Sequence, residues 1–138
     1  MTINQFSFES SPSGVAVTKY VTLYRRSGLP EFEVSKPLDL FPSTPPTGPW
    51  PYPVRAGVYL IYSASFDLLY VGKAQYLGER LSQHFGSGEI CVIRGKWTHQ
   101  PPRYVINIAV PTDMPFEAPA LEAFLIGELQ PSDNSYGK

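Results

Sequence analysis

Arg80 and His84 are the first pair of polar side chains in the sequence that could act together in binding or catalysis. They stand four positions apart in residues 75–85, a segment with helical periodicity, so their side chains project from the same edge of its apolar stripe. Lys73 lies just ahead of that helix. Two cations and a titratable ring facing one spot would suit a phosphate group, whose oxygens a guanidinium matches in geometry. A solvated helix edge is the alternative, and for this pair alone it is the simpler interpretation.

Glu122 is a second candidate because it falls among apolar side chains on a predicted helix. That helix starts at Pro119, a residue suited to a first turn, and runs to about Gln130, just before Pro131. On an ideal wheel at about 100° per residue, Glu122 lies inside the arc of leucines. Proteins keep a buried carboxylate mostly where it is paired, protonated or bound to a cation. Glu128 falls beside the same arc, so the wheel alone leaves a paired structural acid as an alternative.

Other reactive patterns are absent from the sequence. We find no Ser-His-Asp arrangement, no phosphate-binding glycine loop and no closely spaced cluster of metal ligands. One cysteine excludes an intrachain disulfide and a zinc site built on paired thiolates. Tyr59, Tyr62 and Tyr70 are individually weak signals, because aromatic residues favour strands in general.

A small α/β domain must position these side chains. Residues 57–63 alternate as a strand, residues 68–72 form a second strand across a short turn, and residues 103–110 form a third. We therefore expect a mainly antiparallel, three-stranded central sheet flanked by the two helices. This domain would occupy residues 56–138.

Residues 1–55 are predicted to be an extension of that domain. Residues 15–24 are rich in β-branched and aromatic side chains, which predicts a strand that pairs with Phe32 to Val34 as a β-hairpin. One hairpin cannot build an independent core. We expect an arm that lies on the main domain or on a partner.

The end of this extension is rich in proline. Seven of the 15 prolines fall between Pro37 and Pro53, which excludes a helix or a central strand there. We expect an extended connector along the surface, pinned by Trp50 and Tyr52.

Composition narrows the function classes. With 138 residues and 14% aromatic side chains, the chain can bury one core, and no apolar run approaches the roughly 20 residues that span a bilayer. The first residues lack the pattern of a secretory signal, so we expect a soluble, cytoplasmic protein without membrane contact. The net charge of −1 is unlike a strongly basic nucleic-acid binder. Basic side chains nevertheless prevail in residues 57–108 and acidic ones in 109–138, which leaves room for a polyanion site.

The chemistry-bearing residues together resemble the GIY-YIG nuclease superfamily. The strand GVYLIY, the eleven residues from Tyr59 to Tyr70, and the run LLYVGKAQYLGERLSQHF carry the resemblance. The amino-acid sequences of these motifs are most similar to those of the N-terminal nuclease domain of the excision-repair endonuclease UvrC. Arg80 follows ten residues after Tyr70, and Asn134 stands twelve residues beyond Glu122. Five polar positions in this order make the resemblance specific.

The resemblance implies a role for each residue of the first half of the site. Tyr59 would contact or deprotonate the attacking water, Tyr70 would orient the site, and Gly72 closes the second motif. Lys73 would acidify a phenol or hold the water. A free tyrosine has a pKa of about 10. We expect Lys73 and Arg80 to lower the pKa of Tyr59, with His84 relaying the proton.

For the second half, the resemblance implies phosphate and metal binding. Arg80 would clamp the scissile phosphate, Glu122 would be the sole carboxylate ligand of Mg²⁺ or Mn²⁺, and Asn134 would brace the site. His84 stands where members of the family have either histidine or tyrosine. One carboxylate is sufficient, since Mg²⁺ keeps most of its water ligands.

The implied function is a metal-dependent DNA endonuclease, either structure-specific or nicking. The alternatives are a restriction-type or mobile-element endonuclease and a catalytically silent nucleic-acid-binding module. We expect a homodimer, a protein partner or a branched DNA substrate to supply specificity. Interleaved basic and aromatic residues suit strand contact. The predicted contacts are Arg94, Lys96, Trp97, His99 and Arg103 around the 86–102 loop, and Lys19, Arg25 and Arg26 in the arm.

Overall fold

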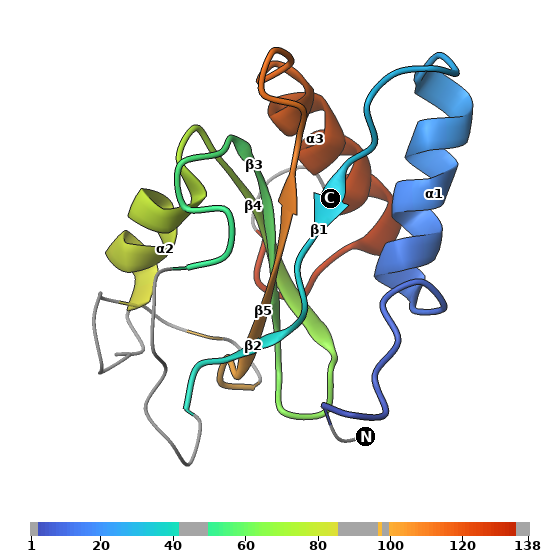
Figure 1. The fold of residues 1–138 in the computed structure, drawn as a ribbon. Helices are drawn as coiled ribbons and strands as arrows, with labels where there is room; N and C mark the ends of the chain where they lie inside the picture. The colour runs from blue at the N-terminus through green and yellow to red at the C-terminus, as the bar shows by residue number, and fades with distance from the viewer. Residues whose placement is uncertain (1–2, 42–49, 86–96, 98–99, 135–138) are drawn as a thin grey trace.

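The computed structural model describes residues 3–41, 50–85, 97 and 100–134. An antiparallel sheet of five strands, in the order β1-β5-β3-β4 with β2 also paired to β5, forms the middle layer. Helix α2 covers one face of the sheet, and α1 and α3 lie together on the other face (Figure 1). In chain order the elements are α1 (Pro12–Tyr24), β1 (Glu33–Val34), β2 (Leu38–Asp39), β3 (Gly57–Tyr62), β4 (Leu68–Ala74), α2 (Leu77–Phe85), β5 (Tyr104–Ala109) and α3 (Glu117–Leu129).

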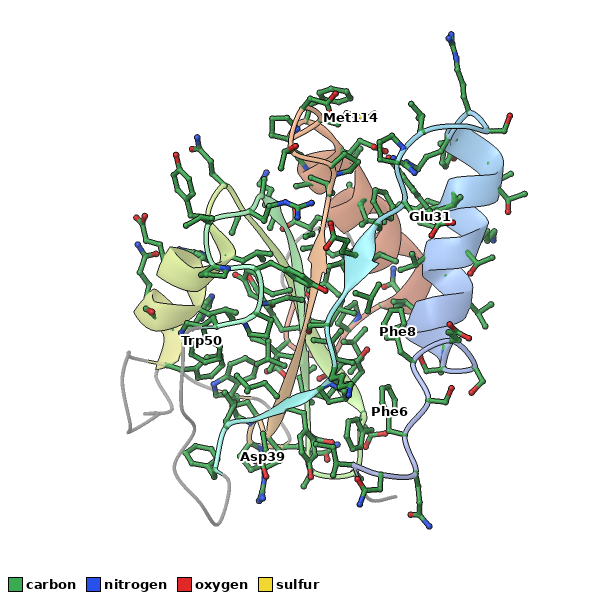
Figure 2. All side chains as sticks on the ribbon, in the orientation of Figure 1. Phe6, Phe8, Glu31, Asp39, Trp50 and Met114 are labelled. Atoms are coloured by element: carbon green, nitrogen blue, oxygen red, sulfur yellow. The ribbon has the colours of Figure 1, made fainter. Side chains whose placement is uncertain are left out.

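The central strand β3 is buried along its whole length and alternates between two cores. Val58, Leu60 and Tyr62 face α1 and α3, whereas Tyr59 and Ile61 face α2. Side chains of the described residues fill the space on both sides of the sheet (Figure 2). The alternation follows from the two-residue period of a strand, so one residue of the GVYLIY motif reaches a different layer from the next.

The expected fold class is confirmed. β3 and β4 pair antiparallel as a hairpin, and β5 pairs with β3 from the other side. The two predicted helices are α2 and α3. Helix α2 starts two residues later than predicted, and α3 starts two residues earlier. No helix in the described part of the chain is long and apolar enough to cross a membrane.

The predicted N-terminal strand at residues 15–24 is wrong, because this segment is helical. Ser11 caps α1, its side chain accepting a hydrogen bond from the Gly14 amide at 3.1 Å, and Pro12 occupies the first turn. Packing against α3 outweighs the strand propensity of the β-branched residues. The buried residues of α1 recur at helical spacing: Ser13, Gly14, Ala16, Val17 and Tyr20.

The predicted hairpin of Phe32 to Val34 with that segment is therefore also wrong. Glu33 and Val34 form β1, which pairs with Ala109 and Ile108 at the end of β5. β2 pairs with the beginning of the same strand. The segment before residue 55 thus adds two short strands to the sheet, and a domain boundary at residues 55/56 stays a prediction.

The connector is pinned by Trp50 and Tyr52, as expected. Both side chains pack on the core beneath α2, and Figure 2 shows Trp50 beside that helix. The Trp50 indole donates a hydrogen bond to Ser82 Oγ at 3.2 Å. The middle of the proline-rich stretch, residues 42–49, lies outside the described residues.

Candidate active site

Tyr59 stands at the centre of the α2 face. Its side chain is 1% exposed, and its ring lies across the backbone of Gly72, its partner on β4. A Cβ atom at position 72 would lie 2.2 Å from Tyr59 Cζ and 2.3 Å from its hydroxyl oxygen. Glycine at the end of the YVG motif is therefore required by the close approach of the tyrosine ring.

Helix α2 brings two side chains to the Tyr59 hydroxyl. His84 Nε2 lies 2.9 Å from the hydroxyl oxygen, and Arg80 Nε donates to the same oxygen at 3.4 Å. The expected juxtaposition of Arg80 and His84 on one side of α2 is thus present. Because the guanidinium donates to the oxygen, the hydroxyl hydrogen is available to Nε2, provided that the ring carries its proton on Nδ1.

The environment keeps both members of this pair neutral. Burial, followed by the charge of Arg80, lowers the pKa of His84 from its ordinary value of 6.5. Burial raises the pKa of Tyr59 to about 12, against the opposing effect of its hydrogen bond from Arg80. The expectation that Arg80 lowers the pKa of Tyr59 is thus confirmed, but the net shift of that pKa is upward. Desolvation of the phenolate outweighs Arg80, and Lys73 is not among the causes.

Tyr70 closes this side of the site. Its ring lies 6.0 Å from the Tyr59 ring and 6.0 Å from the His84 ring, measured between centroids. Trp97 meets Tyr70 edge to face at 6.3 Å. Arg80 is exposed and also donates to Gln83 Oε1 at 3.0 Å, so its guanidinium reaches from the buried phenol to the protein surface.

Glu122 lies on the other side of β4. Its carboxylate is half-buried on α3, and burial raises its pKa. The charge and the backbone amide of Lys73 oppose that rise. The ion pairs of the described residues do not include Glu122, whereas Glu128 pairs with Lys19. Of the two acids beside the leucine arc, Glu128 is the paired one.

Asn134 acts on the free edge of β4. Its Oδ1 accepts from the Val71 amide and its Nδ2 donates to the Val71 carbonyl, both at 2.9 Å. The Asp133 amide donates to the Leu69 carbonyl at 2.8 Å. Asn134 therefore provides hydrogen-bond partners for backbone groups of the edge strand, as a neighbouring strand would. It also fixes the position of the residues just before Gly72.

The predicted residues thus fall into two groups joined by β4. Tyr59, Tyr70, Arg80 and His84 contact one another on the α2 face. Lys73, Glu122 and Asn134 are linked through the outer edge and the end of β4. Residues 70–73 of one strand belong to both groups, which explains why the motif is so compact in sequence.

Of the nucleic-acid contacts predicted around the 86–102 loop, three lie outside the described residues and Arg103 is engaged in an ion pair. Arg94, Lys96 and His99 lie outside the described residues. Arg103 pairs with Asp39 at 2.6 Å and ties β2 to β5.

The three basic residues predicted as contacts in the arm differ in ion pairing and exposure. Lys19 pairs with Glu128 on the surface, and Arg26 is exposed. Arg25 forms an ion pair with Glu117 in which the two side chains are 5% and 7% exposed, so its guanidinium is engaged within the protein. Arg26 is therefore the arginine of this pair that is accessible to a phosphate.

Sequence reasoning missed Asn107 on β5. This residue is fully buried and stands directly opposite Tyr59 in the sheet register. Its signal was an amide side chain inside the apolar run YVINIA, at a position that faces α2.

A metal at this site would rest mainly on one carboxylate. Within the described ranges, no group of three or more His, Cys, Asp and Glu side chains is close enough to hold a metal ion. Glu122 offers a hard oxygen ligand in a partly dehydrated position, which suits a cation that keeps most of its waters.

Comparison with known proteins identifies the family. No curated protein and no solved structure matches the chain. The model of the GIY-YIG catalytic domain matches residues 55–136, more than half of the chain, and does not single out UvrC among the members. The chain therefore belongs to the GIY-YIG family, a family of endonucleases.

Proposed function

We propose that this protein is a metal-dependent endonuclease that hydrolyses phosphodiester bonds of DNA. The observation that carries the proposal is the Tyr59 hydroxyl, held between neutral His84 and the cationic Arg80. A buried phenol with these two neighbours has a proton acceptor on one side and a phosphate ligand on the other.

The residues present fit a single divalent cation at Glu122. Burial disfavours the charged carboxylate, and a bound cation would compensate by favouring the ionised form. When bound, Mg²⁺ or Mn²⁺ would polarise the phosphate and stabilise the departing oxygen. Lys73 lies near enough to interact with the same carboxylate and would help to set its charge.

The chain's own residues supply the remaining steps. Tyr59 takes a proton from the attacking water as it passes its own proton to Nε2 of neutral His84, whose ring carries its proton on Nδ1 in this step. This coupled transfer avoids a free phenolate, which a pKa of about 12 makes costly. The exposed end of Arg80 binds the phosphate and stabilises the charge that develops in the transition state.

We propose a nicking or structure-specific activity, of the kind used in repair. This proposal is supported by the small size of the catalytic core and by the similarity of its motifs to the UvrC nuclease domain. A homodimer or a protein partner would then supply the contacts that select the target.

The experiment is nicking of supercoiled plasmid with Mg²⁺ or Mn²⁺, with a chelator as control. Wild-type protein is compared with Glu122→Ala, Arg80→Ala and the matched control Glu128→Ala, which removes an exposed acid from the same helix. We expect metal-dependent cleavage that is lost in the first two variants and retained in the third.

The products separate the alternatives. Discrete fragments would indicate a site-specific cutter, whereas cleavage of flaps or junctions without cleavage of linear duplex would indicate a structure-specific one. If the wild-type protein cuts neither plasmid nor branched DNA and still shifts DNA in a gel, the protein is a binding module and the proposal is wrong.

A further inference from the structure

The first turn of α2 is held by backbone carbonyls from a distant segment. Backbone amides in the first turn of a helix normally donate hydrogen bonds to a Ser, Thr, Asp or Asn side chain. Here Gln75 and Tyr76 precede the helix instead. Instead the Leu77 amide donates to the Arg55 carbonyl at 3.0 Å, and the Gly78 amide donates to the Pro53 carbonyl at 2.9 Å. Residues 50–55, the end of the proline-rich connector, therefore cap the helix that carries Arg80 and His84.

The 50–55 segment contacts α2 along its whole length. A Cβ atom at Gly78 would lie 2.8 Å from Pro53 Cβ, so the two backbones are in close contact. At the other end, Trp50 bonds to Ser82 and packs its ring 6.2 Å from that of Phe85. Figure 2 shows Trp50 against this helix. The position of α2 over the sheet is thus tied to the position of this segment.

Asn107 is the side chain that anchors the 50–55 segment to the sheet. Its Nδ2 donates to the Pro51 carbonyl at 2.9 Å, while its Oδ1 accepts no hydrogen bond from the described residues. A fully buried amide that is half-satisfied is costly, and an apolar side chain would suit a purely structural position better. The same residue is the cross-strand neighbour of Tyr59.

We propose that Asn107 is a positioning residue, which acts through residues 50–55 to hold Arg80 and His84 against the Tyr59 hydroxyl. The inference rests on the proposed function for its effect on cleavage. Its effect on the geometry around Tyr59 is independent of that function. The path runs from the Asn107 amide to the Pro51 carbonyl, and from the carbonyls of the same segment to the first amides of α2.

The test is Asn107→Leu, which is similar in size and removes the anchor. We expect the rate constant for cleavage to fall about tenfold with little change in KM, as for loss of an outer residue that orients a reactive group. We also expect the pKa of His84 to rise toward its free value. The ring is faced by Arg80 from its own helix, Tyr59 from β3 and Tyr70 from β4, and displacement of α2 would move it away from the two sheet residues.

Histidine ring signals followed by NMR during a pH titration report that change without any activity. The chain has two histidines, so the same titration in a His99→Gln background assigns the signal of His84. Ile106→Val is the matched control, because Ile106 is fully buried on the same strand and faces the other layer. It should lower stability while leaving the pKa of His84 and the cleavage rate unchanged.

Gly78→Ala is a second route to the same displacement, since the added methyl group pushes against Pro53 while Asn107 stays intact. We expect the same rise in the pKa of His84 and the same loss of rate, and this variant carries the test if Asn107→Leu does not fold. If folded variants keep the wild-type pKa of His84 and the wild-type rate, the positioning role is refuted. If the wild-type protein cuts no DNA, the proposed function fails, and the titration still decides the positioning role.

Discussion

The contact between α1 and α3 and the site beneath α2 are built from the same three residue types. In the first, the Tyr20 hydroxyl donates to Glu117 at 3.4 Å, and Arg25 binds both oxygens of that carboxylate at 2.9–3.1 Å. The guanidinium of Arg25 also lies 4.3 Å from the centre of the Phe32 ring. There the tyrosine, arginine and glutamate are hydrogen-bonded and ion-paired with one another, and these contacts join two helices.

In the site, the corresponding residues are Tyr59, Arg80 and Glu122, and the glutamate is kept apart from the other two. Arg80 donates to the tyrosine and to Gln83 and reaches solvent, and Glu122 lies beyond β4 with a raised pKa. Neither charge takes part in the ion pairs of the described residues. Residue type alone therefore does not identify a functional site. A charge that the fold leaves without a full partner does, because it can bind a ligand at no cost to an existing pair.

The largest contrast is expected between two glutamates of α3. Glu122→Gln should reduce cleavage roughly 10³-fold, since it removes the charge that would hold the metal. Its free energy of unfolding at neutral pH should stay the same or rise, because burial disfavours the ionised carboxylate. Glu117→Gln should lower the free energy of unfolding by about 3 kcal/mol, since it strands a buried guanidinium. Its cleavage rate per folded molecule should not change.

Single-turnover cleavage and urea denaturation of the two variants measure this contrast. The comparison between the regions fails if Glu122→Gln loses stability as Glu117→Gln does, or if it cuts DNA at the wild-type rate.

The next effect concerns the proton path from Tyr59 to His84. Because the pKa of His84 is lowered, the ring stays neutral down to a pH below 6.5, and cleavage should decline only below that value. Tyr59→Phe and His84→Gln should each reduce the rate about 10²-fold and abolish this acid limb. Rate–pH profiles of the three proteins provide the measurement. A profile unchanged by Tyr59→Phe would rule out Tyr59 as the base.

A smaller effect should distinguish the two arginines. Arg80→Lys keeps the charge and loses the planar guanidinium, so we expect about a tenfold loss of cleavage rate. Arg25→Lys removes a bidentate contact from a buried pair and should lower the free energy of unfolding by about 1–2 kcal/mol, with no change in rate. Equal rates for Arg80→Lys and wild-type protein would mean that the guanidinium geometry is not used.

The sequence allowed prediction of the elements whose periodicity and local signals agree. The strands around Tyr59 and Tyr70 and the helix of Arg80 belong to this class, because alternation and the apolar stripe indicate the same structure. Helix α1 does not belong to this class, because its strand propensity conflicts with the helix cap at Ser11. Packing against α3 then determines that the segment is helical. Burial was equally hidden in the sequence. The pKa of Tyr59 depends on how deeply its hydroxyl lies, which one-dimensional spacing does not reveal.

The smallest effect should come from the second tyrosine hydroxyl of β3. Tyr62 lies three residues after Tyr59, on the opposite face, where its hydroxyl donates to Ser13 Oγ at 2.9 Å and joins the sheet to α1. Tyr62→Phe removes that bond and leaves a buried serine without it, so the free energy of unfolding should fall by about 1 kcal/mol. Cleavage per folded molecule should equal that of wild-type protein, in contrast to Tyr59→Phe. A loss of rate in Tyr62→Phe at full folding would show that α1 is coupled to the site, and the two faces of β3 would no longer be separate regions.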